Sequence, residues 1–265
     1  MKKNYKDLKF TDDFMFCSIL ERNPDLCKEI TEVILGQKIK EIVKLDQQHA
    51  IRSTPDGRGV RFDVYFEDDE NTIYDIEMQN ASHKGIGKRS RYYQSMIDRR
   101  ILDRSEPYFR LKKTYIIFIC TFDPFGINLP KYTFESTCIE SANLNLGDEA
   151  IKVFINAKGI SKELTPEMKD FISYISSGEA VGPLSRRIEE NLDAARLDSE
   201  MEVAYVTLQE MMDEARAEGH AEGLTEGRIE TIKQILTKLT PSEVIDMGFS
   251  EEDIKLAQKE DRAES

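Results

Sequence analysis

Apolar and polar positions along the first 180 residues predict alternating helices and strands. Residues 10–35 carry apolar side chains at helical spacing, and Gly36 suits the end of such a helix. Short apolar or alternating runs predict strands over residues 39–51, 60–66, 72–79, 114–122 and 149–157. Further helices are predicted over 85–104 and 166–177, and TPDGRG (54–59) has the composition of a turn. The alternation of helix and strand indicates a mixed α/β core.

Residues 184–239 differ from the preceding chain, because they are rich in Glu, Ala, Leu and Met and contain no proline. This composition predicts a long helical arm. Apolar residues recur in the arm at heptad-like spacing, which is typical of a helix that pairs with another helix. They are Met201, Ala204, Leu208, Met211 and Ala215. We therefore expect the arm to make the protein a homo-oligomer.

Glycine recurs at every fourth position after the heptads, at Gly219, Gly223 and Gly227. A line of glycines permits close approach of a second helix. Each glycine also costs about 1 kcal/mol of helix propensity relative to alanine. A flexible linker over residues 217–227 is therefore an alternative to a continuous helix there.

A small tail follows the arm. Thr240-Pro-Ser-Glu243 is a capping box with proline at the first helical position. Gly248 suits the end of that short helix, and Ser250 suits the start of another. The expected domains are thus residues 1–183, 184–239 and 240–265.

The formal net charge of −13 lies entirely in the C-terminal part. Residues 1–188 contain 29 Lys and Arg against 29 Asp and Glu, so the body is neutral. Residues 189–265 contain the remaining 8 basic and 21 acidic residues. The average charge therefore does not exclude a face of the body that binds phosphate groups.

The four cysteines, Cys17, Cys27, Cys120 and Cys138, have no spacing typical of a metal site or of a disulfide framework. They favour a reducing compartment, and we expect a cytoplasmic protein. The first ten residues, MKKNYKDLKF, have no apolar stretch behind their lysines, so no signal peptide is expected. The longest apolar run, residues 115–120, is too short to cross a membrane.

Two neighbouring predicted strands place acidic residues on a common face. Side chains of a strand alternate between faces, so a turn that is symmetric about Glu70 puts Asp63 directly across from Glu77. The same register pairs Phe66 with Tyr74, Val64 with Ile76, and Phe62 with Met78. Facing carboxylates repel each other, and a divalent cation with oxygen ligands is the usual solution. The alternative is a solvated acidic hairpin that binds no metal.

The predicted helix after this hairpin is strongly basic. Residues 84–104 contain seven basic and two acidic side chains. The basic residues are Lys84, Lys88, Arg89, Arg91, Arg99, Arg100 and Arg104. This local excess suits contacts with the phosphates of DNA. The alternative is a solvated face whose cations pair with acids of the protein itself.

Four segments together resemble the Rpn family of recombination-promoting nucleases, which are PD-(D/E)XK transposases. They are TDDFMF (11–16), FDVYF (62–66), IEMQN (76–80) and KRSRYY (88–93). The likeness covers most of residues 8–155 and continues into the glycine repeat of the tail. It implies a restriction-endonuclease-like core, in which helices flank a mixed central sheet.

The resemblance also implies a set of site residues. Asp63 and Glu77 would hold Mg²⁺ or Mn²⁺, and the main-chain carbonyl of Met78 would complete the protein ligands. Asp13 matches an acid that the family carries on a helix near the site. Arg89 matches the arginine of the family's motif, and we expect it to contact DNA.

One position departs from the wider superfamily, because Gln79 stands where the motif has lysine. An amide neither takes up a proton nor carries a charge, so we expect Gln79 to orient water or phosphate. A nearby cation must then replace the lysine. We expect Lys88, Arg89 and Arg91 to hold the DNA backbone.

These features predict a metal-dependent DNA endonuclease with little sequence specificity, whose breaks promote recombination. The alternative is a DNA-binding or assembly protein that keeps the nuclease fold with little or no cleavage. Gln79, the neutral body and the acidic arm favour this alternative to some degree.

Overall fold

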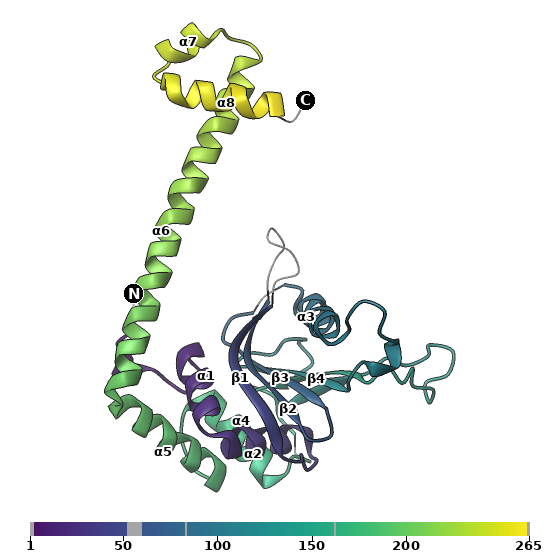
Figure 1. The fold of residues 1–265 in the computed structure, drawn as a ribbon. Coiled ribbons are helices and arrows are strands. Elements are labelled where there is room, and N and C mark those ends of the chain that lie inside the picture. The colour runs from purple at the N-terminus through teal and green to yellow at the C-terminus, as the bar shows by residue number, and fades with distance from the viewer. Residues whose placement is uncertain (1–2, 52–59, 83, 162, 264–265) are drawn as a thin grey trace. The chain divides into compact units, whose positions relative to one another are not determined.

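The computed structural model describes residues 3–51, 60–82, 84–161 and 163–263. A six-stranded sheet forms the centre of the first 201 residues, with the strands in the order β1-β2-β3-β4-β6-β5 (Figure 1). The strands are β1 (Ile42–Ile51), β2 (Val60–Asp68), β3 (Ile73–Gln79), β4 (Thr114–Cys120), β5 (Lys131–Phe134) and β6 (Ala150–Asn156). Strands β3, β4 and β6 run parallel, and the remaining pairings are antiparallel.

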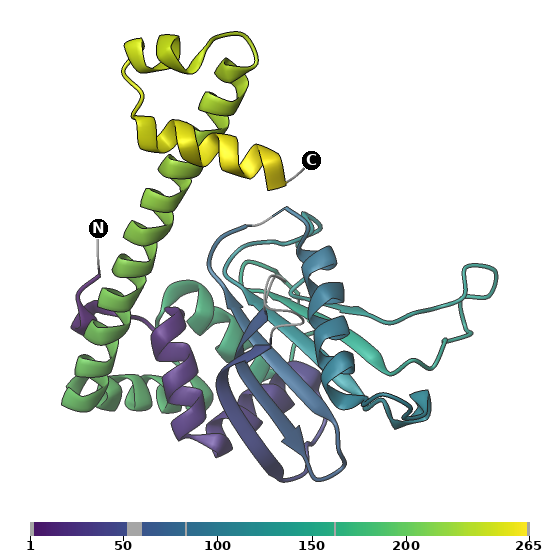
Figure 2. The ribbon, with the colours of Figure 1, turned by 45° about the horizontal axis from the view of Figure 1, so that its top comes forward.

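Helices cover both faces of the sheet, which confirms the predicted mixed α/β fold. Figures 1 and 2 show α3 on one face, with α1, α2 and α4 on the other. The helices of this unit are α1 (Asp13–Arg22), α2 (Pro24–Leu35), α3 (Ile86–Ile101), α4 (Pro166–Ser177) and α5 (Pro183–Leu197). Two short 3-10 helices, η1 (Tyr5–Asp7) and η2 (Tyr108–Arg110), complete it.

The structure differs from the sequence prediction at two elements. The helix expected over residues 10–35 is divided into α1 and α2 at Asn23. Asn23 leaves the helical conformation, with φ −129° and ψ 73°, because the ring of Pro24 disfavours that conformation in the preceding residue. Strand β5 lies in a region that the sequence pattern did not resolve. The turn expected at residues 54–59 lies outside the described residues.

Strands β2 and β3 pair in the predicted register near the turn. The observed partners include Val64–Ile76 and Phe66–Tyr74. The described ladder ends at Val64, and the expected pair of Phe62 with Met78 is not formed. The ring of Phe62 instead lies 5.2 Å from that of Tyr93 on α3. Asp63 therefore lies where the regular strand pairing ends.

Helix α3 packs on the sheet face that carries the acidic residues. Its buried side chains join the apolar residues of the sheet in one cluster. Those α3 side chains are Ile86, Tyr93, Met96 and Ile97. As a result Asp63 is 7% exposed and Glu77 is 0% exposed. The two acids therefore do not lie on a solvated face of the hairpin.

Residues 202–265 form the second compact unit. Helix α6 (Ser199–Leu236) is continuous through the glycine repeat, and α7 (Pro241–Asp246) and α8 (Glu251–Ala263) follow it. The three helices share a small apolar core around Ile232, Val244 and Ala257. The predicted caps are confirmed: Thr240 N donates to Glu243 Oε2 at 2.8 Å, and Asp253 N donates to Ser250 Oγ at 3.1 Å.

The first compact unit ends at Met201, and the second begins at Glu202. Helix α5 belongs to the first unit because it buries Leu184, Ile188 and Leu192 there. The hydroxyl of Tyr5 also donates to the carbonyl of Ala195 at 2.6 Å.

All four cysteines are free thiols, and Cys17, Cys27 and Cys120 are buried. Within the described ranges, no helix combines the length and the apolar character that crossing a membrane requires.

Candidate active site

Asp63 and Glu77 meet at the point where β2 and β3 separate. Asp63 N donates to Glu77 Oε1 at 3.0 Å, and Met78 N donates to Asp63 Oδ2 at 3.0 Å. Side-chain oxygens thus replace the backbone carbonyls that a regular strand pair would use. The two residues predicted to face each other across the hairpin are therefore in contact.

Helix α1 brings a second aspartate to Asp63. Asp13 is the first residue of α1, and Cys17 lies one turn later on the same face. Oxygen atoms of Asp13 and Asp63 and the sulfur of Cys17 all lie within 4.8 Å of one another. Arg61 donates from Nη2 to Asp13 Oδ2 at 3.0 Å. The structure thus places Asp13 at the site, as the resemblance implies, and adds Cys17 and Arg61.

Arg89 lies inside the site. Its Nη2 donates to Glu77 Oε2 at 2.8 Å, and its Nη1 donates to Gln79 Oε1 at 2.9 Å. Its Nε donates to the hydroxyl of Tyr93 at 3.0 Å, and the guanidinium lies over the Tyr93 ring, 4.9 Å from its centroid. Gln79 Nε2 in turn donates to the carbonyl of Met78 at 2.9 Å. Both ends of the Gln79 amide therefore have protein partners, and its water-orienting role stays a prediction.

Asp75 lies beneath α3 on the same face of β3. Its side chain is fully buried, and neither carboxyl oxygen has a hydrogen-bond partner among the described residues. Burial raises the pKa of Asp75 well above its ordinary value, and the carboxylates of Glu77 and Asp63 raise it further. Burial and the neighbouring acids therefore favour the neutral form of this carboxyl group.

The electrostatic state of the site follows from burial and crowding of acids. Burial is the largest cause that raises the pKa of Asp63, and the neighbouring Glu77 and Asp13 raise it further. Burial also raises the pKa of Glu77, while the guanidinium of Arg89 opposes this effect. Without an added cation, Asp63 therefore tends to hold a proton, and Arg89 favours the ionised form of Glu77.

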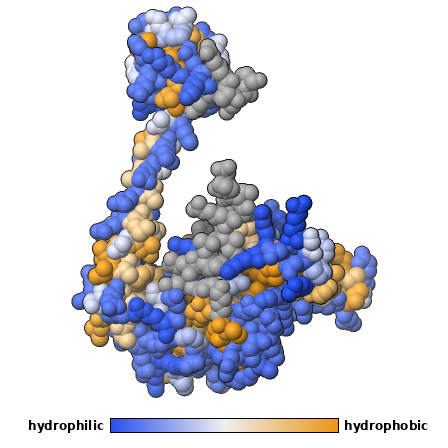
Figure 3. Space-filling model, viewed as in Figure 1, coloured by the Kyte–Doolittle hydropathy of each residue, from blue (hydrophilic) through white to orange (hydrophobic). Residues whose placement is uncertain are grey.

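Lys88 and Arg91 point away from the site. Both side chains are exposed, and within the described part of the chain neither has an ion-pair partner. Figure 3 shows strongly hydrophilic side chains gathered over α3. The absence of acidic partners in the described residues argues against a helix whose cations pair only with the protein itself. The basic helix thus separates into an inward arginine, Arg89, and outward cations.

The residues at this site fit a hard divalent cation. Carboxylate oxygens are the preferred ligands of Mg²⁺, and Asp13 and Asp63 bring two carboxylates together. The thiol of Cys17 is a poor ligand for such an ion, because burial and the adjacent acids raise its pKa and keep it protonated. Glu77 and the carbonyl of Met78, the other expected ligands, have partners in Arg89 and Gln79.

Cys17, Arg61 and Tyr93 were not predicted at the site, although local spacing relates each of them to a residue that was. Asp13 and Cys17 are four residues apart, and helical residues at this spacing share a face. Arg61 precedes Asp63 by two residues, so strand alternation places them on a common face. The contact of Tyr93 with Arg89 follows from the same four-residue spacing on α3. The complete burial of Asp75 has no comparable local signal.

The comparison with protein families agrees with this geometry. A family model described as PD-(D/E)XK nuclease family transposase matches residues 10–173. No curated protein and no solved structure matches the chain. The family match begins before α1, ends within α4, and includes every residue described at the site. Because it covers more than half of the 265 residues, the chain belongs to the PD-(D/E)XK nuclease family transposases.

Proposed function

We propose that this protein is a metal-dependent deoxyribonuclease that cleaves phosphodiester bonds with little sequence specificity, in support of DNA recombination. The observation that carries the proposal is the meeting of Asp13, at the surface, with the buried Asp63 and Glu77, beside the inward arginine Arg89. If Asp13, Asp63, Asp75 and Glu77 were all ionised, their negative charge would exceed the positive charge of Arg61 and Arg89. A bound divalent cation would balance the excess of negative charge.

In this proposal Asp13 and Asp63 hold Mg²⁺ or Mn²⁺, and Glu77 and the carbonyl of Met78 complete the ligands when Arg89 and Gln79 shift. A cation held there supplies the charge that lowers the pKa of water and neutralises the scissile phosphate. The Met78 N–H fixes the orientation of Asp63 through its bond to Oδ2.

Arg89 serves as the cation that Gln79 cannot provide. Its guanidinium lies next to Gln79, at the position where the superfamily motif has lysine. Arginine stays protonated at all relevant pH values, so it cannot act as a base. It can stabilise negative charge that develops on the phosphate.

The outward face of α3 is proposed to hold the DNA backbone. Lys88 and Arg91 are exposed and available for phosphate contacts. Such contacts position the duplex without reading its sequence, which supports weak sequence specificity. The free thiols of the chain support a reducing compartment such as the cytoplasm.

The second candidate is a DNA-binding protein that does not cleave. One observation favours it: both oxygens of Glu77 already accept hydrogen bonds, one from Asp63 N and one from Arg89. A cation at Glu77 must displace this arginine. If Arg89 does not move, the fold is kept and cleavage is lost.

Nicking of supercoiled plasmid DNA in millimolar Mg²⁺ separates the two candidates. The wild-type chain should nick, Asp63→Asn should not, and chelation of the metal should stop the reaction. Asp69→Asn is the matched control, because Asp69 is an exposed acid in the turn of the same hairpin. Absence of nicking by the wild-type chain, together with retained DNA binding, would favour the non-cleaving protein.

A further inference from the structure

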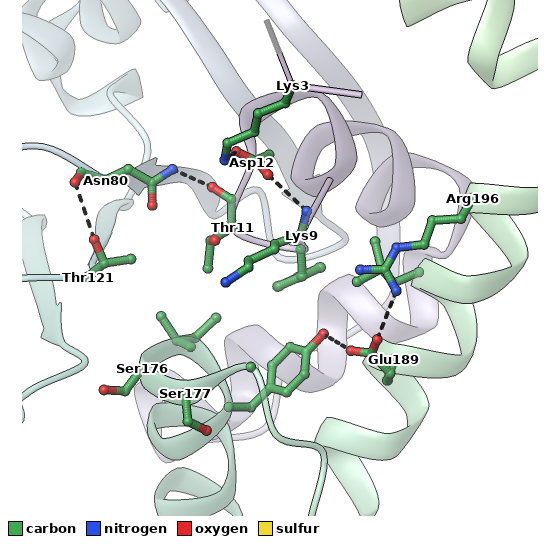
Figure 4. A pocket seen from close by; sticks show the side chains of 15 residues that line it. Lys3, Lys9, Thr11, Asp12, Asn80, Thr121, Ser176, Ser177, Glu189 and Arg196 are labelled. Atoms are coloured by element: carbon green, nitrogen blue, oxygen red, sulfur yellow. Dashed lines mark hydrogen bonds and ion pairs between the residues drawn. The ribbon is translucent and has the colours of Figure 1, made fainter. Parts of the chain in front are cut away.

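A cavity of about 650 Å³ opens beside the candidate active site, on the other face of the sheet. Its walls come from the segment before α1, the ends of β3 and β4, the end of α4, and α5 (Figure 4). This volume lies within the range of small-molecule sites in proteins. The lining is mixed, with the hydroxyls of Thr11 and Ser176 on one hand and Ile175 and Leu192 on the other.

The cavity adjoins the active site through consecutive residues. Asn80 lines it and directly follows Gln79, and Asp12 lines it and directly precedes Asp13. Thr121 lines it too, and its N–H donates to the carbonyl of Gln79 at 3.0 Å. Strand alternation sends Asn80 to the face opposite Gln79. A ligand there would therefore lie one residue away from the site described above.

The position within the sheet is one where ligands bind in other open α/β sheets. Asn80 and Thr121 follow the carboxyl ends of β3 and β4, which are parallel neighbours. Crevices outside the carboxyl ends of parallel strands are the usual binding places in such sheets. Asn80 is held there by a hydrogen bond from its Nδ2 to the carbonyl of Thr11, at 2.5 Å.

The charge inside the cavity comes from Lys9. Of the other charged residues in the lining, Lys3 pairs with Asp12, and Arg196 Nη1 pairs with Glu189 Oε1 at 3.1 Å. The ammonium group of Lys9 has no partner among the residues that the structure describes. Figure 4 shows this side chain extending into the cavity, between Asn80 on one side and the serines of α4 on the other.

We propose that this cavity binds one nucleoside monophosphate unit, with its phosphate on Lys9 and its sugar and base against the hydroxyls and the apolar wall. The unpaired ammonium group of Lys9 can pair with one phosphate. Thr11, Ser176 and Asn80 provide hydrogen bonds for a sugar or a base. This inference rests on the proposed nuclease function and names a subsite for it. The unit can come from the DNA strand next to the scissile phosphate or from a free nucleotide.

Two binding measurements on the full chain test the proposal, and neither depends on cleavage. The first is the thermal shift caused by deoxyadenosine 5′-monophosphate, with deoxyadenosine as the probe that lacks phosphate. The second is the salt dependence of binding to a fluorescent single-stranded oligonucleotide in EDTA. Lys9→Gln is compared with Lys6→Gln, because Lys6 is exposed in the same segment and does not line the cavity.

If free nucleotide is the ligand, the monophosphate should stabilise the wild type and Lys6→Gln, but not Lys9→Gln. Deoxyadenosine should stabilise none of the three. If the unit belongs to a strand, Lys9→Gln alone should weaken oligonucleotide binding and reduce the slope of log affinity against log salt by about 1.

The proposal would be overturned if Lys9→Gln and Lys6→Gln showed the same thermal shift with the monophosphate and the same affinity and salt slope with the oligonucleotide. The proposed function would survive that result if Lys88→Ala and Arg91→Ala still weakened oligonucleotide binding. If the wild type bound no oligonucleotide at all, the result would instead count against the proposed function itself. The two failures are therefore distinguishable. Slower acetylation of Lys9 than of Lys6 in the presence of a saturating probe would place the ligand directly.

Discussion

The guanidinium of Arg89 neutralises the fully buried carboxylate of Glu77, through a hydrogen bond of 2.8 Å between Nη2 and Oε2. Arg89 itself remains 35% exposed at its side chain. One partner of the pair is therefore buried in the sheet, and the other reaches solvent. In this arrangement the protein's own arginine occupies one of the two carboxylate oxygens that a metal would need.

Arg89→Ala should destabilise the metal-free protein, because it leaves a buried carboxylate without its cation. Breaking a buried pair costs about 3–5 kcal/mol, and partial exposure of Arg89 reduces the expected loss to about 2 kcal/mol. Urea unfolding of the wild type and of the variant measures this loss in the free energy of unfolding. Arg91→Ala, an exposed arginine on the same helix, should change the free energy of unfolding by less than about 0.5 kcal/mol. Equal losses in both variants would contradict the role assigned to the pair.

The metal-free protein should lose stability as the pH rises. The pKa values of Asp63, Asp75 and Glu77 are raised on folding, mainly by burial, so above about pH 4 the folded state binds more protons than the unfolded state. That extra stability is present in acid and is lost as the pH rises through the raised pKa values. Melting temperatures in EDTA should show this slope, and Asp63→Asn should flatten it.

Magnesium should reverse this dependence on pH. A cation binds the ionised carboxylates, so it competes with protons, and its stabilising effect should grow from about pH 5.5 to about pH 8.5. Thermal melts with and without millimolar Mg²⁺ measure the difference, and Asp63→Asn should abolish it. A stabilisation that is the same at every pH, or that persists in Asp63→Asn, would place the metal elsewhere.

Asp75→Val should stabilise the protein. Neither oxygen of Asp75 has a hydrogen-bond partner in the described part of the chain, and burying such a group costs about 1–3 kcal/mol. Valine suits a strand whose neighbour across the ladder is Ile116. Urea unfolding should give a gain of about 1 kcal/mol or more at neutral pH. Asp69→Val, in the exposed turn, should give no gain in stability. A loss of stability in Asp75→Val would refute the view that the buried Asp75 carboxyl group destabilises the fold.

Lys88→Ala and Arg91→Ala should each weaken DNA binding for all sequences alike. Each should also reduce the slope of log affinity against log salt by about 1, because one phosphate contact is lost. Arg186→Ala is the matched control, since Arg186 is an exposed arginine on α5. Slopes that stay at the wild-type value in both α3 variants would show that this face does not meet DNA.

Helix α6 should make the protein an oligomer. Several of its apolar side chains are exposed in the single chain: Val203, Val206, Met211, Met212 and Leu224. Sedimentation should give a larger mass for the full chain than for a chain ending at Met201, the boundary of the first unit. If both chains sediment as monomers, the arm is not an assembly device.

The glycines of α6 provide a finer test of how such an oligomer packs. No atom lies within 4 Å of a Cβ added at Gly219, Gly223 or Gly227, so alanine fits each position within the single chain. The triple alanine variant should make the helix more stable, by about 1 kcal/mol per position. If a second helix approaches along the glycines, the same variant should dissociate the oligomer. An unchanged mass would show that assembly uses the heptad region alone.

Local patterns in the sequence were enough to predict most of the helices and strands and the acidic pair of the candidate site. Strand alternation and the symmetric turn specified the register of β2 with β3, and with it the meeting of Asp63 and Glu77, because these constraints are local. The apolar stripe of α3 and the caps of α7 and α8 followed from equally local spacing. The break at Asn23 was also within reach, since it depends only on the following proline.

Tertiary structure alone decided what each charged side chain does. Arg89 and Arg91 are two residues apart on one basic helix, yet the first binds Glu77 and the second faces solvent. Helical spacing puts the two arginines on different sides of α3, and the packing of α3 against the sheet decides which of them meets Glu77. The same packing buries Asp75, and the meeting of five separate segments leaves Lys9 in a cavity. Local periodicity assigns each residue to a face of its element, but only the packing of distant segments decides what that face meets.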